Sequence, residues 1–258
     1  MRADSIEPGP LAGRRALVTG GGRGVGSAIT RALAAAGADV AVTYVRDEEQ
    51  AAATVTAIEA FGVRGRAYRG SVTEPADNQA VVEAAAADLG GLDLLVSNAG
   101  IASRGRTVAE TDAAELEKVL RVHALGPHDL CRAALPYLRQ NARSDVVFIS
   151  SVAAHRFMAG GAPYTMGKAA QEALAHTLAR EERAHGVHVN IVAPGLVDTE
   201  MGVRLARATR GARDIRELDA GSPFGHVCSP DEVAEAVLFL VAAGYVDDQR
   251  IVVDGGTF

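Results

Sequence analysis

Short apolar, β-branched runs alternate along this chain with longer, alanine-rich segments in which apolar residues recur every three or four positions. The short runs predict buried strands, and the longer segments predict amphipathic helices. Strands and helices that alternate in this way build a parallel sheet from βαβ units. We expect strands at residues 15–19, 39–45, 63–70, 92–97, 146–150, 187–193 and 250–254.

Helical segments lie between these strands. They are expected from the glycines after residue 19 to residue 36, and over residues 47–61, 75–89, 113–138, 164–185 and 231–243. No internal repeat or linker divides the series, so the pattern predicts one α/β domain over residues 1–258, with residues 1–13 as an N-terminal tail. The expected fold is a doubly wound, seven-stranded parallel sheet flanked by helices, which binds ligands beyond the carboxyl ends of its strands.

The helix expected at residues 113–138 contains Gly126 and Pro127 in its middle. A proline inside a helix removes a hydrogen bond and crowds the preceding turn, at a cost of about 3 kcal/mol. In a regular helix the carbonyl of His123 would accept from the N–H of residue 127. Because proline has no N–H, the sequence predicts that this carbonyl loses its helical partner.

Composition excludes several classes of function. The formal net charge of -6 and the absence of a basic arm argue against a nucleic-acid partner. Cys131 and Cys228 lie far apart with no CxxC spacing, and the histidines have no metal-site spacing, so we expect free thiols and no metal. The chain has no apolar signal segment and no run long enough to span a bilayer, which predicts a cytoplasmic protein without membrane contact.

A glycine-rich stretch, TGGGRGVG at residues 19–26, directly follows the first strand. Gly20, Gly24 and Gly26 let the backbone turn sharply and approach a pyrophosphate, while the next helix offers free N–H groups. Glycines also form ordinary turns, but their place between a strand and a helix favours a phosphate-binding loop.

The end of the second strand bears on the choice of cofactor. An acidic residue there binds an unmodified ribose in many dinucleotide sites, whereas this chain has Tyr44, Val45 and Arg46. With Arg23 in the glycine-rich stretch, Arg46 favours a 2′-phosphate and therefore NADP(H) over NAD(H). The alternative is that Arg46 only pairs with a neighbouring carboxylate on the surface.

Tyr164 and Lys168 stand four residues apart at the start of an expected helix, and Ser151 follows the fifth strand. The spacing puts both side chains on one helix face, where an ammonium would lower the tyrosine pKa from about 10 and make the phenol a general acid or base. The stretches SNAG and NIVAPG also end strands. These groups therefore meet at one edge of the predicted sheet.

The sequence resembles the short-chain dehydrogenase/reductase family over nearly its whole length, and in particular its 3-oxoacyl-[acyl-carrier-protein] reductase branch. The residues that carry the resemblance are TGGGRGVG, NAG at 98–100, Ser151, Tyr164 with Lys168, PG at 194–195 with Thr199, and VDGG at 253–256. The resemblance implies a Rossmann-type fold and hydride transfer between a nicotinamide and a carbonyl carbon. It implies that Tyr164 passes the proton, Ser151 holds the substrate oxygen and Lys168 binds the nicotinamide ribose.

The resemblance also implies a set of cofactor-binding residues. Asn98 would lie near the adenosine ribose, and Val197 and Thr199 would hold the carboxamide. Ser71 departs from the aspartate that contacts adenine in the family, and Ser97 departs from the family's usual NNAG. The full set is Gly20, Gly22, Arg23, Gly24, Val25, Gly26, Tyr44, Arg46, Ser71, Val72, Asn98, Ala99, Gly100, Tyr164, Lys168, Pro194, Gly195, Val197 and Thr199.

His123 replaces the asparagine that is the fourth catalytic residue of the family. The resemblance implies that this position acts through its main-chain carbonyl, which holds a water in a proton relay from Lys168. We hypothesise that Pro127 keeps this carbonyl free, so that His123 still serves as a catalytic residue. Two alternatives stay open: the imidazole itself shuttles protons, or Gly126 and Pro127 only bend the helix and His123 is a satisfied core residue.

Residues 199–225 stand where the family has a mobile substrate lid, and an arginine recurs there at every third position. The run is either a solvated helix face or a lid that attracts an acidic or phosphate-bearing substrate, with Arg104 and Arg106 adding to the field. Phe157, Met158 and Leu196 are expected to line an apolar part of the pocket. The lid arginines are Arg204, Arg207, Arg210, Arg213 and Arg216.

These observations favour an NADP(H)-dependent reductase of a ketone or 3-oxoacyl thioester that forms a homotetramer or homodimer. One alternative is an NAD-linked alcohol, steroid or sugar dehydrogenase. The other is a catalytically weak NADP-binding regulatory protein, although such a protein would not require Ser151, Tyr164 and Lys168 together.

Overall fold

The computed structural model of the chain describes residues 9–257 and contains a seven-stranded, all-parallel sheet, as the sequence predicts. The strand order is β3-β2-β1-β4-β5-β6-β7, so the direction of winding reverses between β1 and β4. The strands are β1 (Arg15–Val18), β2 (Asp39–Tyr44), β3 (Gly65–Arg69), β4 (Leu94–Ser97), β5 (Ser144–Ile149), β6 (Val187–Pro194) and β7 (Arg250–Val253).

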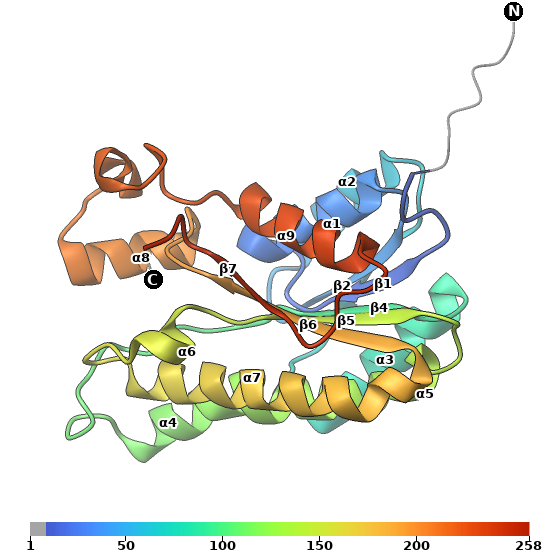
Figure 1. Cartoon of the computed structure of the whole chain (residues 1–258), viewed down its shortest axis with the longest axis horizontal. Coiled ribbons are helices and arrows are strands. Elements are labelled where there is room, and N and C mark those ends of the chain that lie inside the picture. The colour runs from blue at the N-terminus through green and yellow to red at the C-terminus, as the bar shows by residue number, and fades with distance from the viewer. Residues whose placement is uncertain (1–8, 258) are drawn as a thin grey trace, which may run out of the picture.

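Helices cover both faces of this sheet (Figure 1). One layer holds α1 (Gly24–Ala35), α2 (Glu48–Glu59) and α9 (Pro230–Ala242). The opposite layer holds α3 (Pro75–Leu89), α4 (Ala113–Leu120), the π-helix η1 (Arg121–Leu125), α5 (Gly126–Leu138) and α7 (Ala162–Glu182). Shorter elements complete the chain: α6 (Ala153–Arg156), η2 (Arg183–His185), α8 (Glu200–Arg210) and η3 (Ile215–Gly221).

Two apolar clusters hold the layers to the sheet, one on each face. Because successive strand residues point to opposite faces, Ala16 and Val18 of β1 pack beneath α1 and α9, whereas Leu17 packs beneath the other layer. Residues in the middle of both clusters are fully buried. This burial on both faces explains why the strands read as continuous apolar runs in the sequence.

The observed boundaries differ from the predicted ones at element ends, and two helices, α6 and α8, were not predicted. The helix expected from Tyr164 begins at Ala162, because Pro163 suits the first turn. Of the predicted N-terminal tail, residues 1–8 lie outside the described residues. Leu11 is buried, and its N–H donates to the carbonyl of Ala36 at 2.9 Å.

The sequence predicts no membrane-spanning helix, no metal site and no disulfide, and residues 9–257 bear on each of these predictions. In this part of the chain no helix is long and apolar enough to cross a membrane. The described residues also contain no group of three or more His, Cys, Asp or Glu side chains arranged to hold a metal ion. Cys131 and Cys228 are both free thiols.

Candidate active site

The carboxyl ends of β1 and β4 lie side by side, at the point where the winding reverses. Thr19, just after β1, accepts through its Oγ1 from the N–H groups of Asn98 and Ala99, each at 3.0 Å. The Asn98 side-chain amide in turn donates to the carbonyls of Thr19 at 2.8 Å and Gly20 at 3.3 Å. The NAG stretch is thereby fastened to the glycine-rich loop, and Asn98 braces that loop.

The glycines of this loop are required by its backbone and by its packing. Gly20 and Gly24 have φ of 64° and 52°, values that side-chain-bearing residues rarely adopt. A Cβ at Gly26 would overlap the carbonyl oxygen of Gly20 and lie 2.6 Å from the Asn98 amide nitrogen. Gly22 has room, since the nearest atom to its Cβ position is Thr54 Oγ1 at 3.7 Å. The loop therefore folds tightly against the start of α1 and opens at Gly22.

The N-terminus of α1 fits a phosphate group. Its N-cap, Arg23, makes no side-chain cap, and the first turn contains no acidic residue. By contrast, α2, α4, α8 and α9 each have a side-chain N-cap. Uncapped N–H groups and the positive end of the helix dipole attract anions. The exposed Arg23 guanidinium lies at this end of α1, where it pairs with Glu200 at 3.3 Å.

The end of β2 carries the second arginine of the predicted cofactor site. Arg46 is exposed and has no ion-pair partner within residues 9–257. The neighbouring carboxylate of Asp47 instead caps α2 by accepting from the N–H of Gln50 at 2.9 Å. The surface pairing considered as the alternative is therefore absent from the described residues, and Arg46 is available to a ligand.

Ser71 and Val72 continue the same edge after β3. The Ser71 N–H donates to the Asp77 carboxylate at 2.9 Å, and its hydroxyl lies 2.8 Å from the Thr73 hydroxyl. The Val72 carbonyl accepts from the Asn78 amide at 3.0 Å. These bonds hold the turn that follows β3 against the start of α3.

The structure brings Ser151, Tyr164, Lys168 and His123 together. The Ser151 side chain is near enough to the Tyr164 phenol to favour its ionised form. The Lys168 Nζ lies 5.9 Å from the centroid of the Tyr164 ring, and the His123 ring meets that ring edge-on with centroids 5.1 Å apart. Three segments far apart in the sequence, η1, the turn after β5 and α7, thus supply one compact group of polar side chains.

The electrostatics of this group differ from the sequence-based expectation. Burial raises the pKa of Tyr164, and the nearby Ser151 side chain only partly opposes this effect. Burial also lowers the pKa of Lys168 to about 7, although the Glu172 carboxylate favours its charged form. The expected lowering of the tyrosine pKa by the ammonium is therefore not found in the ligand-free chain. Burial thus disfavours the charged form of both side chains, the phenolate of Tyr164 and the ammonium of Lys168.

Lys168 is held inside the protein by two acceptors. Its Nζ donates to the carbonyl of Ile149 at 2.6 Å and to Oε1 of Gln171 at 3.1 Å. The side chain is only 2% exposed. This position keeps the amine next to the end of β5, directly before the segment that carries Ser151.

His123 is fully buried and neutral. Burial and the nearby Lys168 charge lower its pKa to about 3. Its Nε2 lies 2.8 Å from the carbonyl oxygen and 3.2 Å from the amide nitrogen of Ile101, whereas Nδ1 has no partner within the described residues. This low pKa does not favour a proton shuttle that requires a charged imidazole at neutral pH. The unpartnered Nδ1 does not favour a fully satisfied core histidine.

The interruption of the long helix is a π-helical turn. The Gly126 N–H donates to the carbonyl of Arg121, one residue further back than in an α-helix. A Cβ at Gly126 would overlap the carbonyl oxygen of Val72, so close packing requires glycine there. Pro127 lies in the first turn of α5, where no intrahelical N–H bond is needed. The sequence placed the interruption correctly, but it indicated a bend where the structure has a wider turn.

The stretch after β6 approaches the glycine-rich loop. The Gly195 N–H donates to the Val253 carbonyl at 2.9 Å, and a Cβ at Gly24 would lie 3.4 Å from the Thr199 methyl group. Thr199 caps α8 through its hydroxyl, which accepts from the Gly202 N–H at 3.1 Å. Val197 is buried, and its backbone bridges to Cys228. Pro194 ends β6 and is also buried.

The segment predicted as a lid extends away from the sheet (Figure 1). It has a small apolar core of its own around Ala206 and Ile215, to which Leu196 packs. Arg204 pairs with Glu200 and Arg216 with Asp198. No ion pair is formed by the other lid arginines, Arg207, Arg210 and Arg213, within the described residues.

The remaining predicted pocket residues separate into two groups. Arg104 and Arg106 both pair with Asp112, at 3.4 and 3.5 Å, which reduces the field they would add. Phe157 and Met158 are 73% and 58% exposed, and Phe157 adopts φ of 50°. These two apolar side chains are open to a ligand in the loop between Ser151 and Tyr164.

Sequence reasoning missed Glu172, a buried carboxylate one helical turn beyond Lys168. It accepts hydrogen bonds from three side chains on three other segments. The four-residue spacing from Lys168 was a signal, but glutamates at that spacing are common on solvated helix faces.

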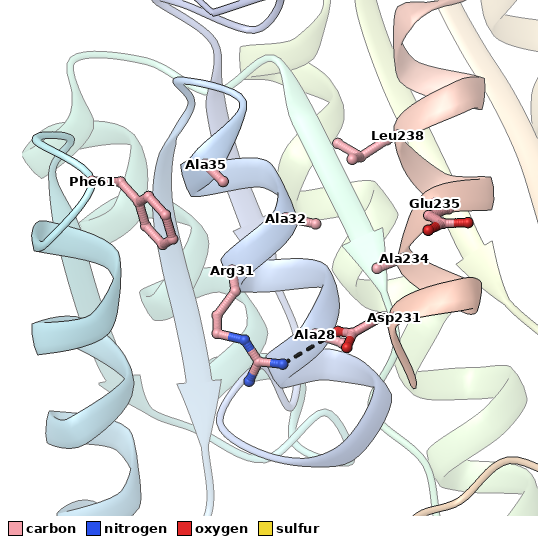
Figure 2. Close-up of a pocket in the computed structure, with 9 residues that line it drawn as sticks. All are labelled: Ala28, Arg31, Ala32, Ala35, Phe61, Asp231, Ala234, Glu235 and Leu238. Carbon is pink, nitrogen blue, oxygen red and sulfur yellow. Dashed lines mark hydrogen bonds and ion pairs between the residues drawn. The ribbon is translucent and has the colours of Figure 1, made fainter. Parts of the chain in front are cut away.

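One groove lies away from these residues, between α1 and α9. It has a volume of about 310 Å³ and is lined by four alanines, by Phe61 and Leu238, and by three charged residues. Figure 2 shows that the ion pair between Arg31 and Asp231, at 3.3 Å, spans it. The groove contains none of the predicted site residues.

Comparison with known proteins agrees with this arrangement. Residues 20–257 match the family model described as Enoyl-(Acyl carrier protein) reductase. The chain is 37% identical to short-chain reductase protein NovJ of Streptomyces niveus, covering 93% of this chain and 92% of that protein. It is 32% identical to the 3-oxoacyl-[acyl-carrier-protein] reductase FabG of Escherichia coli, over 95% and 98% of the two chains.

A solved structure gives the same result for the fold. The short-chain dehydrogenase from Burkholderia cenocepacia J2315, in complex with NADP, has a TM-score of 0.86 and 35% identity over 96% of this chain and 98% of its own. Sequence similarity and architecture are therefore both shared over almost the full length. The chain belongs to the short-chain dehydrogenase/reductase family, whose members are oxidoreductases that use a nicotinamide cofactor.

Proposed function

We propose that this protein is an NADP(H)-dependent oxidoreductase that interconverts a ketone and the matching secondary alcohol. The single observation that carries the proposal is the grouping of Ser151, Tyr164 and Lys168, in which the buried amine of Lys168 lies 5.9 Å from the centroid of the Tyr164 ring. This group lies at the same sheet edge as the uncapped start of α1. A proton donor and a dinucleotide-binding loop at one edge are what carbonyl reduction requires.

Each side chain has a distinct task in this proposal. The Ser151 hydroxyl donates to the substrate oxygen and orients it, and the Tyr164 phenol donates its proton to that oxygen during reduction. A bound nicotinamide supplies or accepts the hydride. The charged amine of Lys168 stabilises the phenolate that remains, which offsets the unfavourable effect of burial on Tyr164. Pro127 has no N–H to donate to the His123 carbonyl, and in this proposal that carbonyl holds a relay water.

The cofactor-binding residues are proposed from the same edge. Gly20, Gly22, Gly24 and Gly26 form the loop that approaches the pyrophosphate, and Arg46 with Arg23 holds a 2′-phosphate. The absence of an acidic partner for Arg46 within residues 9–257 supports the preference for NADP(H). Two structural neighbours, the Burkholderia cenocepacia dehydrogenase and a blue fluorescent protein from a metagenomic library, are complexes with NADP and NADPH.

We propose 3-oxoacyl thioesters as the first substrate class to test. Residues 199–225 would act as the lid over the substrate, and Arg207, Arg210 and Arg213 would attract a phosphate-bearing carrier. The name of the Escherichia coli relative supports this class. Another relative, the L-fucose dehydrogenase of Mus musculus, is 34% identical and makes sugar oxidation the second class to test.

The oxidation or appearance of NADPH and NADH at 340 nm, followed with both substrate classes, tests the proposal. We expect turnover with NADPH on at least one ketone and its loss in Tyr164→Phe, with cofactor binding retained. Turnover that survives Tyr164→Phe would refute the role of Tyr164. Tight NADPH binding without turnover on any substrate would favour a regulatory protein.

We also propose a homo-oligomer. A groove of about 400 Å³ between α5 and α7 is lined by apolar side chains that include Leu135, Leu174 and Leu178. Light scattering coupled to size-exclusion chromatography distinguishes this assembly from a monomer of 26.7 kDa.

A further inference from the structure

Glu172 joins four segments of the chain at the back of the candidate site. Its carboxylate accepts from the Ser150 hydroxyl at 2.6 Å, lies 2.7 Å from Nε2 of His155, and accepts from Nε of Arg250 at 3.0 Å. These partners come from the end of β5, from α6 and from β7, while Glu172 belongs to α7. The carboxylate is only 4% exposed, so this network is almost shielded from solvent.

The network holds the backbone on both sides of Ser151. Ser150 precedes it and is bound directly by Glu172. The carbonyl of Ser151 itself accepts from the Arg250 guanidinium at 3.5 Å, and this guanidinium is bound to Glu172. His155, in the short helix that follows, completes the attachment. The segment that carries the serine is thereby fixed to the helix that carries Tyr164 and Lys168.

Glu172 also acts on the charge of Lys168. It lies four residues beyond Lys168 on α7, and its negative charge favours the ammonium form. The other ionisable groups near the amine are Tyr164 on the same helix and His123 on η1, both neutral at pH 7. Two further groups contact Glu172 on its far side, His155 of α6 and Arg250 of β7.

We propose that Glu172 is a positioning residue, which holds the Ser151 segment against α7 and keeps the buried amine of Lys168 protonated. The kinetic part of this inference rests on the proposed function. The charge part does not, since the protonation of Lys168 can be measured without turnover.

The chain offers a direct measurement, because it contains only two lysines, Lys118 and Lys168. Labelling with lysine that carries ¹³C at Cε gives one resonance for each, and the exposed Lys118 serves as an internal reference. We expect Lys168 to titrate at about pH 7 in the cofactor-free wild type. In Glu172→Gln its midpoint should fall by about one pH unit, since a nearby opposite charge has been removed.

Glu182→Gln is the matched control. Glu182 lies on the same helix, is 2% exposed, and is also paired with an arginine of another helix, Arg139, at 2.5 Å. It stands ten residues beyond Glu172 and so is far from Lys168. Glu182→Gln should reduce stability as Glu172→Gln does, and should leave the Lys168 titration unchanged.

The kinetic expectation uses the same two variants. Glu172→Gln should lower kcat about tenfold, because a displaced hydroxyl orients the substrate poorly, while the KM for NADPH stays within about twofold. The alkaline limb of its pH profile for reduction should move to lower pH together with the Lys168 midpoint. The proposal is overturned if the Lys168 midpoint matches that of the wild type, or if kcat falls no further than in Glu182→Gln.

If Glu172→Gln does not fold, Glu172→Asp provides a second test of the inference. The shorter carboxylate retains the charge and loses reach, so the Lys168 midpoint should stay near the wild-type value while kcat falls. Wild-type kcat in Glu172→Asp would overturn the positioning role. If the wild type turns over no substrate, the proposed function fails, and the Lys168 titration still decides the charge part.

Discussion

The most direct prediction concerns Lys168 and the stability of the cofactor-free protein. Burial lowers the pKa of this lysine from 10.5 to about 7. The unfolded chain therefore binds a proton that the folded chain releases between these two pH values, and stability must rise with pH over that window. Below pH 7 both states are protonated, so the cost of the buried charge is fully present.

The size of the effect follows from the same pKa values. Each pKa unit corresponds to about 1.4 kcal/mol, so the buried charge costs about 5 kcal/mol at low pH. In Lys168→Met this cost disappears, but the Ile149 carbonyl and the Gln171 amide oxygen lose their donor. Each stranded acceptor costs about 1–3 kcal/mol at any pH. We therefore expect the variant to be less stable than the wild type near pH 10, and to recover most of this difference near pH 6.

Urea unfolding followed by circular dichroism, measured from pH 6 to pH 10, tests this reasoning. The free energy of unfolding of the wild type should gain about 4 kcal/mol relative to Lys168→Met across this range. Lys118→Met is the control, since Lys118 is exposed and its removal should produce no such slope. A difference between wild type and Lys168→Met that does not change with pH would refute the assignment of a depressed lysine pKa.

Three further predictions concern the cofactor loop and the interrupted helix. Arg46→Ala should weaken NADPH binding about 10- to 100-fold, the equivalent of one charge-assisted hydrogen bond to phosphate, and leave NADH binding unchanged; equal loss for both cofactors in fluorescence titrations would contradict this. Gly26→Ala should abolish NADPH binding because its Cβ would overlap the Gly20 carbonyl oxygen, whereas Gly22→Ala, which has room, should change it less than about threefold. Pro127→Ala supplies an N–H that pairs with the His123 carbonyl when the π-helical turn relaxes to the α-helical register, so kcat should fall with little change in KM; unchanged turnover and pH dependence would show that the proline only shapes the helix.

The sheet could be predicted from the sequence because its strands are buried on both faces. Continuous apolar runs such as those of β1 and β4 have no polar alternation to confuse their assignment, and their order along the chain follows from the βαβ pattern. The ends of elements were harder to predict. The start of α7 at Ala162 depends on a proline in its first turn, and α8 forms within a charged stretch because Thr199 caps it.

The residues of the candidate site could be named from motifs, but their interactions could not. Asn98 is predicted to lie near the cofactor, and the sequence did not indicate that its amide also braces two backbone carbonyls of the glycine-rich loop. Glu172 was not singled out at all, because its partners come from β5, α6 and β7. Long-range contacts of this kind leave no periodic trace in the sequence.

The position of the His123 side chain depends on the space that two glycines leave around it. A Cβ at Gly100 would lie 2.9 Å from the imidazole Cε1, and a Cβ at Gly167 would lie 2.9 Å from the Cβ of His123. A side chain at either position would therefore displace His123 from Ile101. The ring that fits there holds the segment after the NAG stretch through Ile101.

The groups that are unfavourable for folding are concentrated around Lys168. Within residues 9–257, four buried side-chain polar atoms have no hydrogen-bond partner, and two of them, His123 Nδ1 and Gln171 Nε2, belong to side chains that interact with Lys168. A buried ammonium and two orphaned nitrogen atoms in one place are unfavourable for folding alone. Natural proteins keep such groups together where chemistry requires them. The unfavourable burial of these groups therefore indicates the same residues as the sequence motifs do, by an independent physical argument.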